Sequence, residues 1–149
     1  MNSWLLYALL AAVSASFVTV FTKIGINNLS PSLATAVRSI IMALFLVSVS
    51  FFKGDLNNIN QLFEYKKDFV YLVFAGISGA LSWLFLNIAL KTGKTWQVAP
   101  IDKLSVVITV VVSILIFKEQ ISIKGIIGVL LIALGTIFVA LGKILIYMV

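Results

Sequence analysis

Five long apolar stretches alternate with short polar segments along this chain of 149 residues. A transmembrane helix needs about 20 consecutive, mostly apolar residues, and each stretch is long enough. None shows the strict alternation of apolar and polar positions that marks a transmembrane β-strand. The pattern therefore predicts an all-α integral membrane protein that forms one domain over residues 1–149. Its five transmembrane helices are expected at residues 3–22, 33–52, 69–90, 98–117 and 123–147.

Local signals support these boundaries. Ser30-Pro31 is typical of a helix start, because serine accepts a hydrogen bond from a free N–H group and proline fits the first turn. The one sizeable polar stretch, residues 53–68, is expected to be a surface loop with room for a short amphipathic helix. The segments 91–95 and 118–122 are short enough to be tight turns. The last three helices are therefore expected to be antiparallel neighbours.

Composition narrows the class of function. Hydrophobic residues make up 62% of the chain, its mean hydropathy is +1.17, and it contains neither cysteine nor histidine. Disulfides, thiol chemistry and the usual zinc or haem ligands are thereby excluded, and we expect neither an enzyme nor a protein with a metal or other cofactor. The net charge of +6 comes from basic residues at the ends of apolar segments, a pattern that indicates membrane anchoring rather than nucleic-acid binding.

The fourth predicted helix carries a polar stripe. Asp102, Ser105, Thr109 and Ser113 recur at helical spacing and share one face, whereas Lys103 points about 100° away, so the two adjacent charges are not expected to share a face. A carboxylate inside a bilayer is costly, which favours a role in a polar pathway. The alternative is that both charges lie at the headgroup boundary while the hydroxyls bond to backbone carbonyls one turn back.

Three other predicted helices carry matching stripes. Each stripe alone is commonly explained by packing, but together they predict a central polar cavity. The stripes consist of Ser16, Thr19, Lys23 and Asn27 on the first helix, Thr35, Arg38 and Met42 on the second, and Gly79, Trp83, Asn87 and Lys91 on the third.

The fifth predicted helix differs because its repeated residue is glycine. Gly128, Gly135 and Gly142 recur every seven residues, and Gly125 adjoins them. Small residues on one stripe allow another helix backbone to approach closely in a membrane. The stripe predicts helix packing, either within one protomer or between the two protomers of a dimer.

Positive charge is almost evenly divided between the two sides of the predicted membrane domain. Orientation follows the excess of Lys and Arg on the cytoplasmic side, so this division favours insertion in both orientations and an antiparallel homodimer of ten helices. The alternative is that the Lys66-Lys67 pair or one dominant helix sets a single orientation. One side holds Lys53, Lys66, Lys67, Lys118 and Lys124, and the other holds Lys23, Arg38, Lys91, Lys94, Lys103 and Lys143.

The chain resembles a single EamA-type repeat of the drug/metabolite transporter superfamily. Most members have two such repeats, inverted relative to each other, so the resemblance implies a homodimer, or a separate second half, that completes a ten-helix transporter. The small multidrug exporters of the superfamily use a carboxylate in the first helix, which is absent here. The resemblance rests on the helix end at Lys23, on Arg38, on Gly76-Ile-Ser-Gly79, on Val98-Ala-Pro100 before Leu104-Ser105, on Phe117 to Ser122, and on Gly125 to Gly135.

Together these features predict a small secondary transporter in a bacterial or archaeal cytoplasmic membrane, acting by alternating access on an anionic or zwitterionic metabolite. Asp102 is the candidate protonation or charge-pairing residue, with Lys23, Arg38 or Lys91 as its partner. The alternatives are a proton-coupled exporter of cationic or aromatic drugs and a scaffold without transport activity. The predicted substrate and coupling residues are Ser16, Thr19, Lys23, Arg38, Trp83, Asn87, Lys91, Asp102, Ser105 and Thr109.

Overall fold

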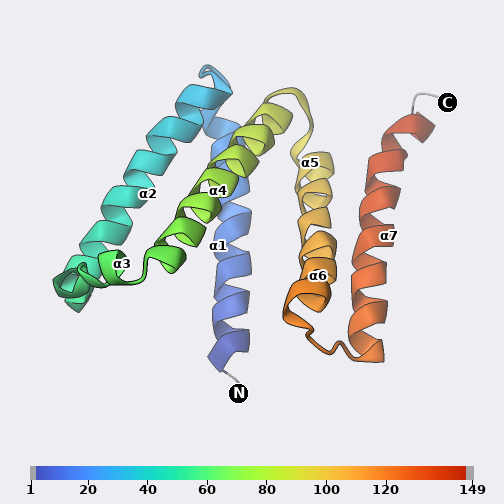
Figure 1. Cartoon of the computed structure of the whole chain (residues 1–149). Helices are drawn as coiled ribbons and strands as arrows, with labels where there is room; N and C mark the ends of the chain where they lie inside the picture. The colour runs from blue at the N-terminus through green and yellow to red at the C-terminus, as the bar shows by residue number, and fades with distance from the viewer. Residues whose placement is uncertain (1–2, 147–149) are drawn as a thin grey trace. The chain divides into compact units, whose positions relative to one another are not determined.

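The computed structural model describes the backbone of residues 3–146 and the side chains of residues 3–62 and 64–142. Within these residues every regular element is a helix, and five spans are long and apolar enough to cross a membrane, as the hydropathy pattern predicts. The chain divides into unit 1, which contains α1 to α4, and unit 2, which contains α5 to α7. The elements are α1 (Ser3–Gly25), α2 (Pro31–Lys53), η1 (Asp55–Asn58), α3 (Gln61–Glu64), α4 (Lys66–Thr92), α5 (Thr95–Asp102), α6 (Leu104–Phe117) and α7 (Ile123–Ile146) (Figure 1).

In unit 1, α2 begins where the Ser30-Pro31 signal predicts. The Ser30 hydroxyl accepts a hydrogen bond from the Leu33 N–H at 3.3 Å, and Pro31 occupies the first turn. The helix ends at Gly54, whose φ of 78° is left-handed and favours glycine. Both ends of α2 are therefore set by local sequence.

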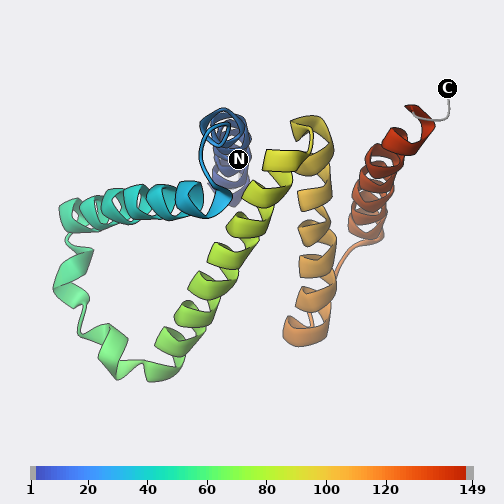
Figure 2. The ribbon, with the colours of Figure 1, turned by 90° about the horizontal axis from the view of Figure 1, so that it is seen from above.

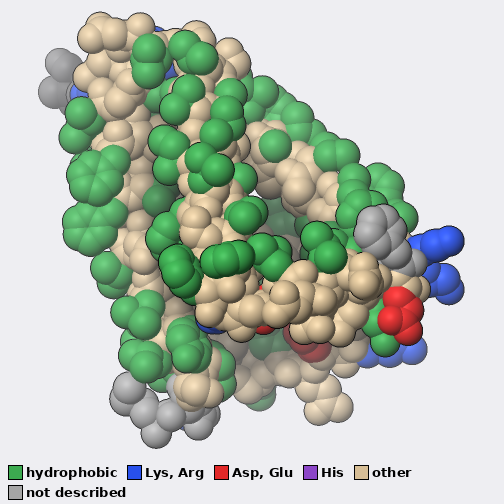
Figure 3. All heavy atoms as spheres, turned by 90° about the vertical axis from the view of Figure 1, so that its left-hand side faces the viewer, with side chains coloured by type: hydrophobic (Ala, Val, Ile, Leu, Met, Phe, Trp, Pro, Cys, Tyr) green, Lys and Arg blue, Asp and Glu red, His purple; other side chains and the backbone are tan. Residues whose placement is uncertain are grey.

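The polar connector between α2 and α4 is partly helical. It contains the 3-10 turn η1 and the single-turn helix α3 rather than an irregular loop. Figure 3 shows apolar side chains covering most of this side of unit 1, whereas the charged side chains gather at the edge where the connector lies. Because apolar surface faces lipid and charge faces water, this connector marks one membrane boundary of unit 1.

The helices of unit 1 meet at the opposite end. Figure 2 shows α2 and α4 lying closest where α2 begins and α4 ends, and diverging towards the connector. Ile26, at the end of α1, and Leu90, near the end of α4, are 1% and 0% exposed. The buried polar residues Thr35 and Asn87 lie near the same helix ends. The tightest packing of unit 1 is therefore at the boundary remote from the connector.

In unit 2, the fourth span is not the continuous helix that was predicted. It begins at Thr95, three residues earlier than expected, and is interrupted at Lys103 between α5 and α6. Pro100 has no N–H to donate to the turn before it, and the interruption lies three residues after this proline, where an i→i+3 bond replaces the α-helical pattern. The Pro100 carbonyl instead accepts hydrogen bonds from the Lys103 N–H at 3.0 Å and from the Thr136 hydroxyl of α7 at 3.3 Å.

Helix α7 packs against both pieces of this interrupted span, so the predicted neighbour relation of the last two spans holds. Its buried contact residue is Thr136, which is 4% exposed and also donates to the Ile132 carbonyl. The predicted end of this helix at residue 147 lies outside the described residues.

Candidate functional site

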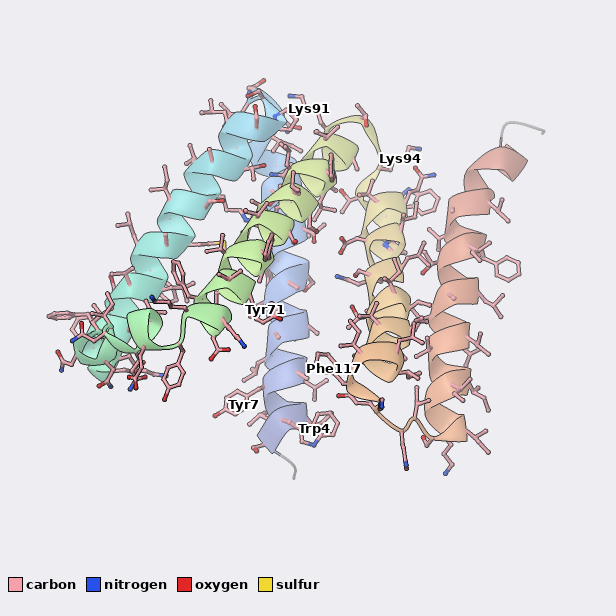
Figure 4. The ribbon with its side chains drawn as sticks, viewed as in Figure 1. Trp4, Tyr7, Tyr71, Lys91, Lys94 and Phe117 are labelled. Carbon is pink, nitrogen blue, oxygen red and sulfur yellow. The ribbon has the colours of Figure 1, made fainter. Side chains whose placement is uncertain are left out.

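The polar cluster of unit 1 lies below one membrane boundary. Along α1, the aromatic residues Trp4 and Tyr7 lie at the start and Lys23 lies near the end (Figure 4). Trp4 and Lys23 are about 28 Å apart at 1.5 Å per residue, close to the thickness of a bilayer's hydrocarbon core. Aromatic residues and lysines at these two levels are the anchors expected at the two interfaces.

Two lysines link α1 and α4 at this boundary. Lys23 Nζ donates to the Leu90 carbonyl near the end of α4. In return, Lys91 Nζ donates to the carbonyls of Ile26, Asn27 and Leu29 at 2.7, 2.8 and 3.0 Å, just after α1 ends (Figure 4). A cation at a helix C-terminus is favourable because the last carbonyls have no partner within the helix.

Arg38 lies deeper than the two lysines. It is seven residues into α2 from Pro31, about 10 Å along the helix. Its guanidinium lies 4.0 Å from the centre of the Trp83 ring, and its Nη1 donates to the Thr22 hydroxyl at 3.3 Å. A cation stacked on an indole is stabilised by about 2 kcal/mol or more when water is excluded. Arg38 is thus held with its charge below the interface.

Asn87 lies one turn after Trp83 and is 1% exposed. Its Nδ2 donates to the Thr35 hydroxyl at 2.7 Å, and that hydroxyl donates to the Pro31 carbonyl at 2.7 Å. The other amide atom, Asn87 Oδ1, is buried and has no hydrogen-bond partner among the described residues. Such orphaned acceptors are uncommon in folded proteins and often mark functional positions.

The structure therefore brings together five of the predicted site residues, namely Lys23, Arg38, Trp83, Asn87 and Lys91. Thr22 and Thr35 complete the cluster, although neither was among the predicted site residues. The sequence signal for Thr35 was its helical spacing from Arg38, whereas Thr22 lies outside the stripe of α1, so periodicity alone does not identify it.

Three of the other predicted hydroxyls bond to backbone carbonyls about one turn back. Ser16 and Thr19 donate to the carbonyls of Val13 and Ala15, and Ser105 donates to the Asp102 carbonyl. Ser16, Ser105 and Thr109 are exposed on the surfaces of α1 and α6. Within their own units, Ser16, Thr19 and Ser105 follow the backbone-bonding alternative.

The prediction that Asp102 and Lys103 do not share a face is wrong. Lys103 Nζ lies 3.0 Å from Asp102 Oδ2 and forms an ion pair with it, the only one among the described residues. The helix is interrupted at Lys103, and the long lysine side chain reaches back across the angle between the two Cα–Cβ bonds. Asp102 is also deeper than expected, about 10 Å from the start of the span at Thr95.

The glycines of α7 divide into two kinds. A Cβ added at Gly125 would lie 2.7 Å from Ile121 Cγ1, so glycine is needed for the turn into α7. At Gly128, Gly135 and Gly142 an added Cβ would meet no atom within 4 Å. These three glycines are therefore not explained by close helix packing within unit 2.

The electrostatics of unit 1 are asymmetric. Its acidic residues, Asp55, Glu64 and Asp68, belong to the connector or the first turn of α4. Asp68 and Lys91 are about 35 Å apart along α4. The cluster at the other end holds three cations with no carboxylate of its own unit nearby, so it is suited to hold an anion. A group of three or more metal-ligating side chains does not occur among the described residues.

Comparison with known proteins places this geometry in context. The sequence pattern of the EamA-like transporter family matches residues 2–141. A Sinorhizobium protein, named an uncharacterized transporter in the cobO 3' region, is 29% identical over 139 residues, which cover 93% of this chain and 97% of that protein. An uncharacterized protein of Methanocaldococcus jannaschii is 28% identical over 145 residues, 96% of this chain and all of that protein. No solved structure matches the chain significantly.

Proposed function

Because the chain belongs to the EamA-like transporter family, we propose that it is a secondary transporter that moves a small anionic or zwitterionic metabolite by alternating access. The observation that carries the substrate class is Arg38, a cation below the membrane boundary with no carboxylate partner among the described residues. An ionisable residue inside a membrane is costly to maintain and is commonly functional.

The roles within the cluster differ from one residue to the next. Lys23 and Lys91 donate to backbone carbonyls that end α4 and α1, so their main role is to fix the helix ends. Arg38 makes one hydrogen bond to a neutral hydroxyl and stacks on Trp83, which leaves guanidinium N–H groups for a ligand. A carboxylate or phosphate accepts two parallel hydrogen bonds from such a group. Arg38 is therefore the residue we assign to the anion.

A cationic drug is the second candidate substrate, and the structure favours it less. The acid assigned to such a drug, Asp102, already has Lys103 as its partner at 3.0 Å. An incoming cation would have to displace this lysine from Asp102. We keep Asp102 as the candidate coupling residue. In the coupling step, a proton would bind Asp102 and release Lys103 from the ion pair.

The working form we propose is an antiparallel homodimer. Both relatives are matched over nearly their full length, so they are about as long as this chain and also have room for one five-helix unit. Two inverted units around a mid-membrane site form a known architecture for alternating access. Gly128, Gly135 and Gly142, which have open space around them, are the positions we assign to the contact with the second copy. The near-even division of lysines supports insertion in both orientations.

Flux measurements in proteoliposomes test the substrate class. Labelled small carboxylates and amino acids are compared with a cationic dye, for wild-type protein and for Arg38→Gln. We expect flux of anions or zwitterions that Arg38→Gln lowers by about 100-fold, while Lys94→Gln, at an exposed cation, retains it. Flux of the dye alone would establish the drug exporter instead. Absence of all flux, together with unchanged phenotypes of Arg38→Gln in cells, would establish the scaffold.

Orientation is tested separately. Reporters that are active only inside or only outside the cell are fused to the C-terminus. Comparable signals from both reporters are expected for dual insertion, whereas one signal alone contradicts the antiparallel homodimer. In that case the second half must come from another chain. Replacement of Gly128 and Gly135 by alanine should reduce dimer formation without lowering the stability of unit 2, because the added Cβ atoms meet no atom within 4 Å.

A further inference from the structure

The orphaned oxygen of Asn87 is the feature of unit 1 that the proposed function does not yet use. The amide is fixed on one side, since its Nδ2 donates to Thr35 and the Thr35 hydrogen is directed to the Pro31 carbonyl. Oδ1 is therefore left as a buried acceptor without a donor among the described residues. A buried acceptor without a donor costs free energy, and a donor carried by a ligand would recover this cost.

The position of this acceptor relates it to the anion-binding residue. Asn87 follows Trp83 by one turn on α4, and Thr35 precedes Arg38 by about one turn on α2. The Asn87–Thr35 hydrogen bond and the Arg38–Trp83 contact are therefore about one turn apart along the interface between α2 and α4. Residues four apart on a helix have Cβ atoms about 6 Å apart. A ligand held by the Arg38 guanidinium over Trp83 therefore lies about one helical turn from the level of Asn87.

We infer that Asn87 Oδ1 accepts a hydrogen bond from an N–H or O–H group of the transported anion, so that Asn87 selects anions that carry an amino or hydroxyl group. This inference rests on the proposed function, because it requires Arg38 to hold the anionic end. Asn87 is 1% exposed, so the donor reaches it in a conformation in which α2 and α4 separate at this end. In the conformation seen here, the two helices are closed over the acceptor.

The site distinguishes ligands by whether they carry a donor. An anion with an amino or hydroxyl group satisfies both Arg38 and Asn87. A plain carboxylate of the same size satisfies Arg38 and leaves Oδ1 buried and unpaired. A site built around a hydrogen bond rejects the analogue that lacks the bonding group, because its own polar atom then stays unpaired.

Binding to the purified full-length protein tests this with two matched series: propionate, lactate and alanine, and 3-phenylpropionate, phenyllactate and phenylalanine. In at least one series, wild-type protein is expected to bind the hydroxy or amino member about tenfold or more tightly than the plain carboxylate. Asn87→Leu should remove this preference and leave the affinity for the plain carboxylate within about twofold. Asn87→Ala, which adds no branched side chain, is the second variant if Asn87→Leu does not fold.

Asn28→Leu is the matched control, since it makes the same change at an exposed amide in the turn between α1 and α2 and should keep the preference. A preference that persists in both Asn87 variants overturns the inference about Asn87 and leaves the proposed function intact. Equal binding of all three members of a series by wild-type protein also overturns it. If wild-type protein binds no anion of either series, the proposed substrate class fails as well, and the two failures are thus distinguished.

Discussion

The two units of the chain hold their charged residues in opposite ways. In unit 2 the acid Asp102 and the cation Lys103 neutralise each other within one turn, at 3.0 Å. In unit 1 the cations are spread over three helices and contact neutral groups. Lys23 and Lys91 bond to carbonyls, and Arg38 stacks on an indole and bonds to a hydroxyl.

This difference separates a locally compensated charge from an uncompensated one. Carbonyls and a hydroxyl stabilise a cation through their dipoles and an aromatic ring does so through its quadrupole, but none of them removes its charge. Unit 1 therefore keeps a net positive cluster at one end, whereas the ion pair of unit 2 is neutral. We therefore assign the attraction of the ligand to unit 1. The Asp102–Lys103 ion pair of unit 2 is one that a proton or a conformational change can open.

The largest effect is expected from removing the charge of Arg38. Arg38→Gln should lower the flux of the transported anion by about 100-fold, because the anion then loses a charged partner inside the membrane. Arg38→Lys should retain part of the flux, since it keeps the charge but lacks the planar pair of donors. Flux in proteoliposomes at equal protein content is the measurement. Full activity of Arg38→Gln would refute the assignment of ligand attraction to unit 1.

A smaller effect is expected from removing the lysine that closes the end of α1. Lys91→Met keeps the aliphatic stem but loses three hydrogen bonds to carbonyls. We expect it to destabilise the protein by about 2 kcal/mol, visible as a lower Tm in detergent. Lys67→Met, at the exposed opposite end of α4, is the control and should leave the Tm unchanged. An unchanged Tm for Lys91→Met would mean that Lys91 is free to bind ligand instead.

A double-mutant cycle should show that Asp102 and Lys103 of unit 2 stabilise the protein as a coupled pair. Asp102→Asn leaves Lys103 without its counter-charge, and a cost of about 1–2 kcal/mol is expected at this partly exposed position. The double variant Asp102→Asn/Lys103→Met should recover most of that stability. If Asp102 is also the coupling residue, the single variant Asp102→Asn and the double variant should both lose flux driven by a proton gradient. The double variant should nevertheless stay folded. Additive destabilisation by the two changes would argue against a coupled pair.

The smallest effect is expected at the contact that joins α7 to the interrupted span. Thr136→Val removes the hydroxyl that donates to the Pro100 carbonyl at 3.3 Å but keeps the shape of the side chain. The expected loss of stability is about 1 kcal/mol, because the carbonyl keeps its bond to the Lys103 N–H. Thermal unfolding compared with Thr136→Ser, which retains the hydroxyl, measures this contribution. A loss as large as that of Lys91→Met would show that the interruption depends on Thr136.

Much of the fold was predictable because a bilayer constrains it strongly. The number of spans follows from hydropathy, and the start of α2 follows from Ser30-Pro31. The site was predictable in part, since helical spacing placed Arg38, Trp83 and Asn87 on polar faces. Spacing gives only the direction in which a side chain leaves its own helix. It does not show that Arg38 meets Trp83, because that contact depends on where α2 and α4 approach each other.

By itself, the sequence determined that this chain is a five-span membrane protein and where its acids and cations fall along the spans, because length, apolarity and charge placement are local properties. The tertiary structure decided which groups the charges meet. It directed Lys23 and Lys91 to carbonyls and placed the Trp83 ring beneath Arg38. It also left Asn87 Oδ1 without a donor among the residues that the structure describes. The physical reason is that a charge or amide inside a bilayer bonds to the groups that lie within about 3 Å of it. Which groups lie there depends on where the helices cross, and the crossing is set by helix packing.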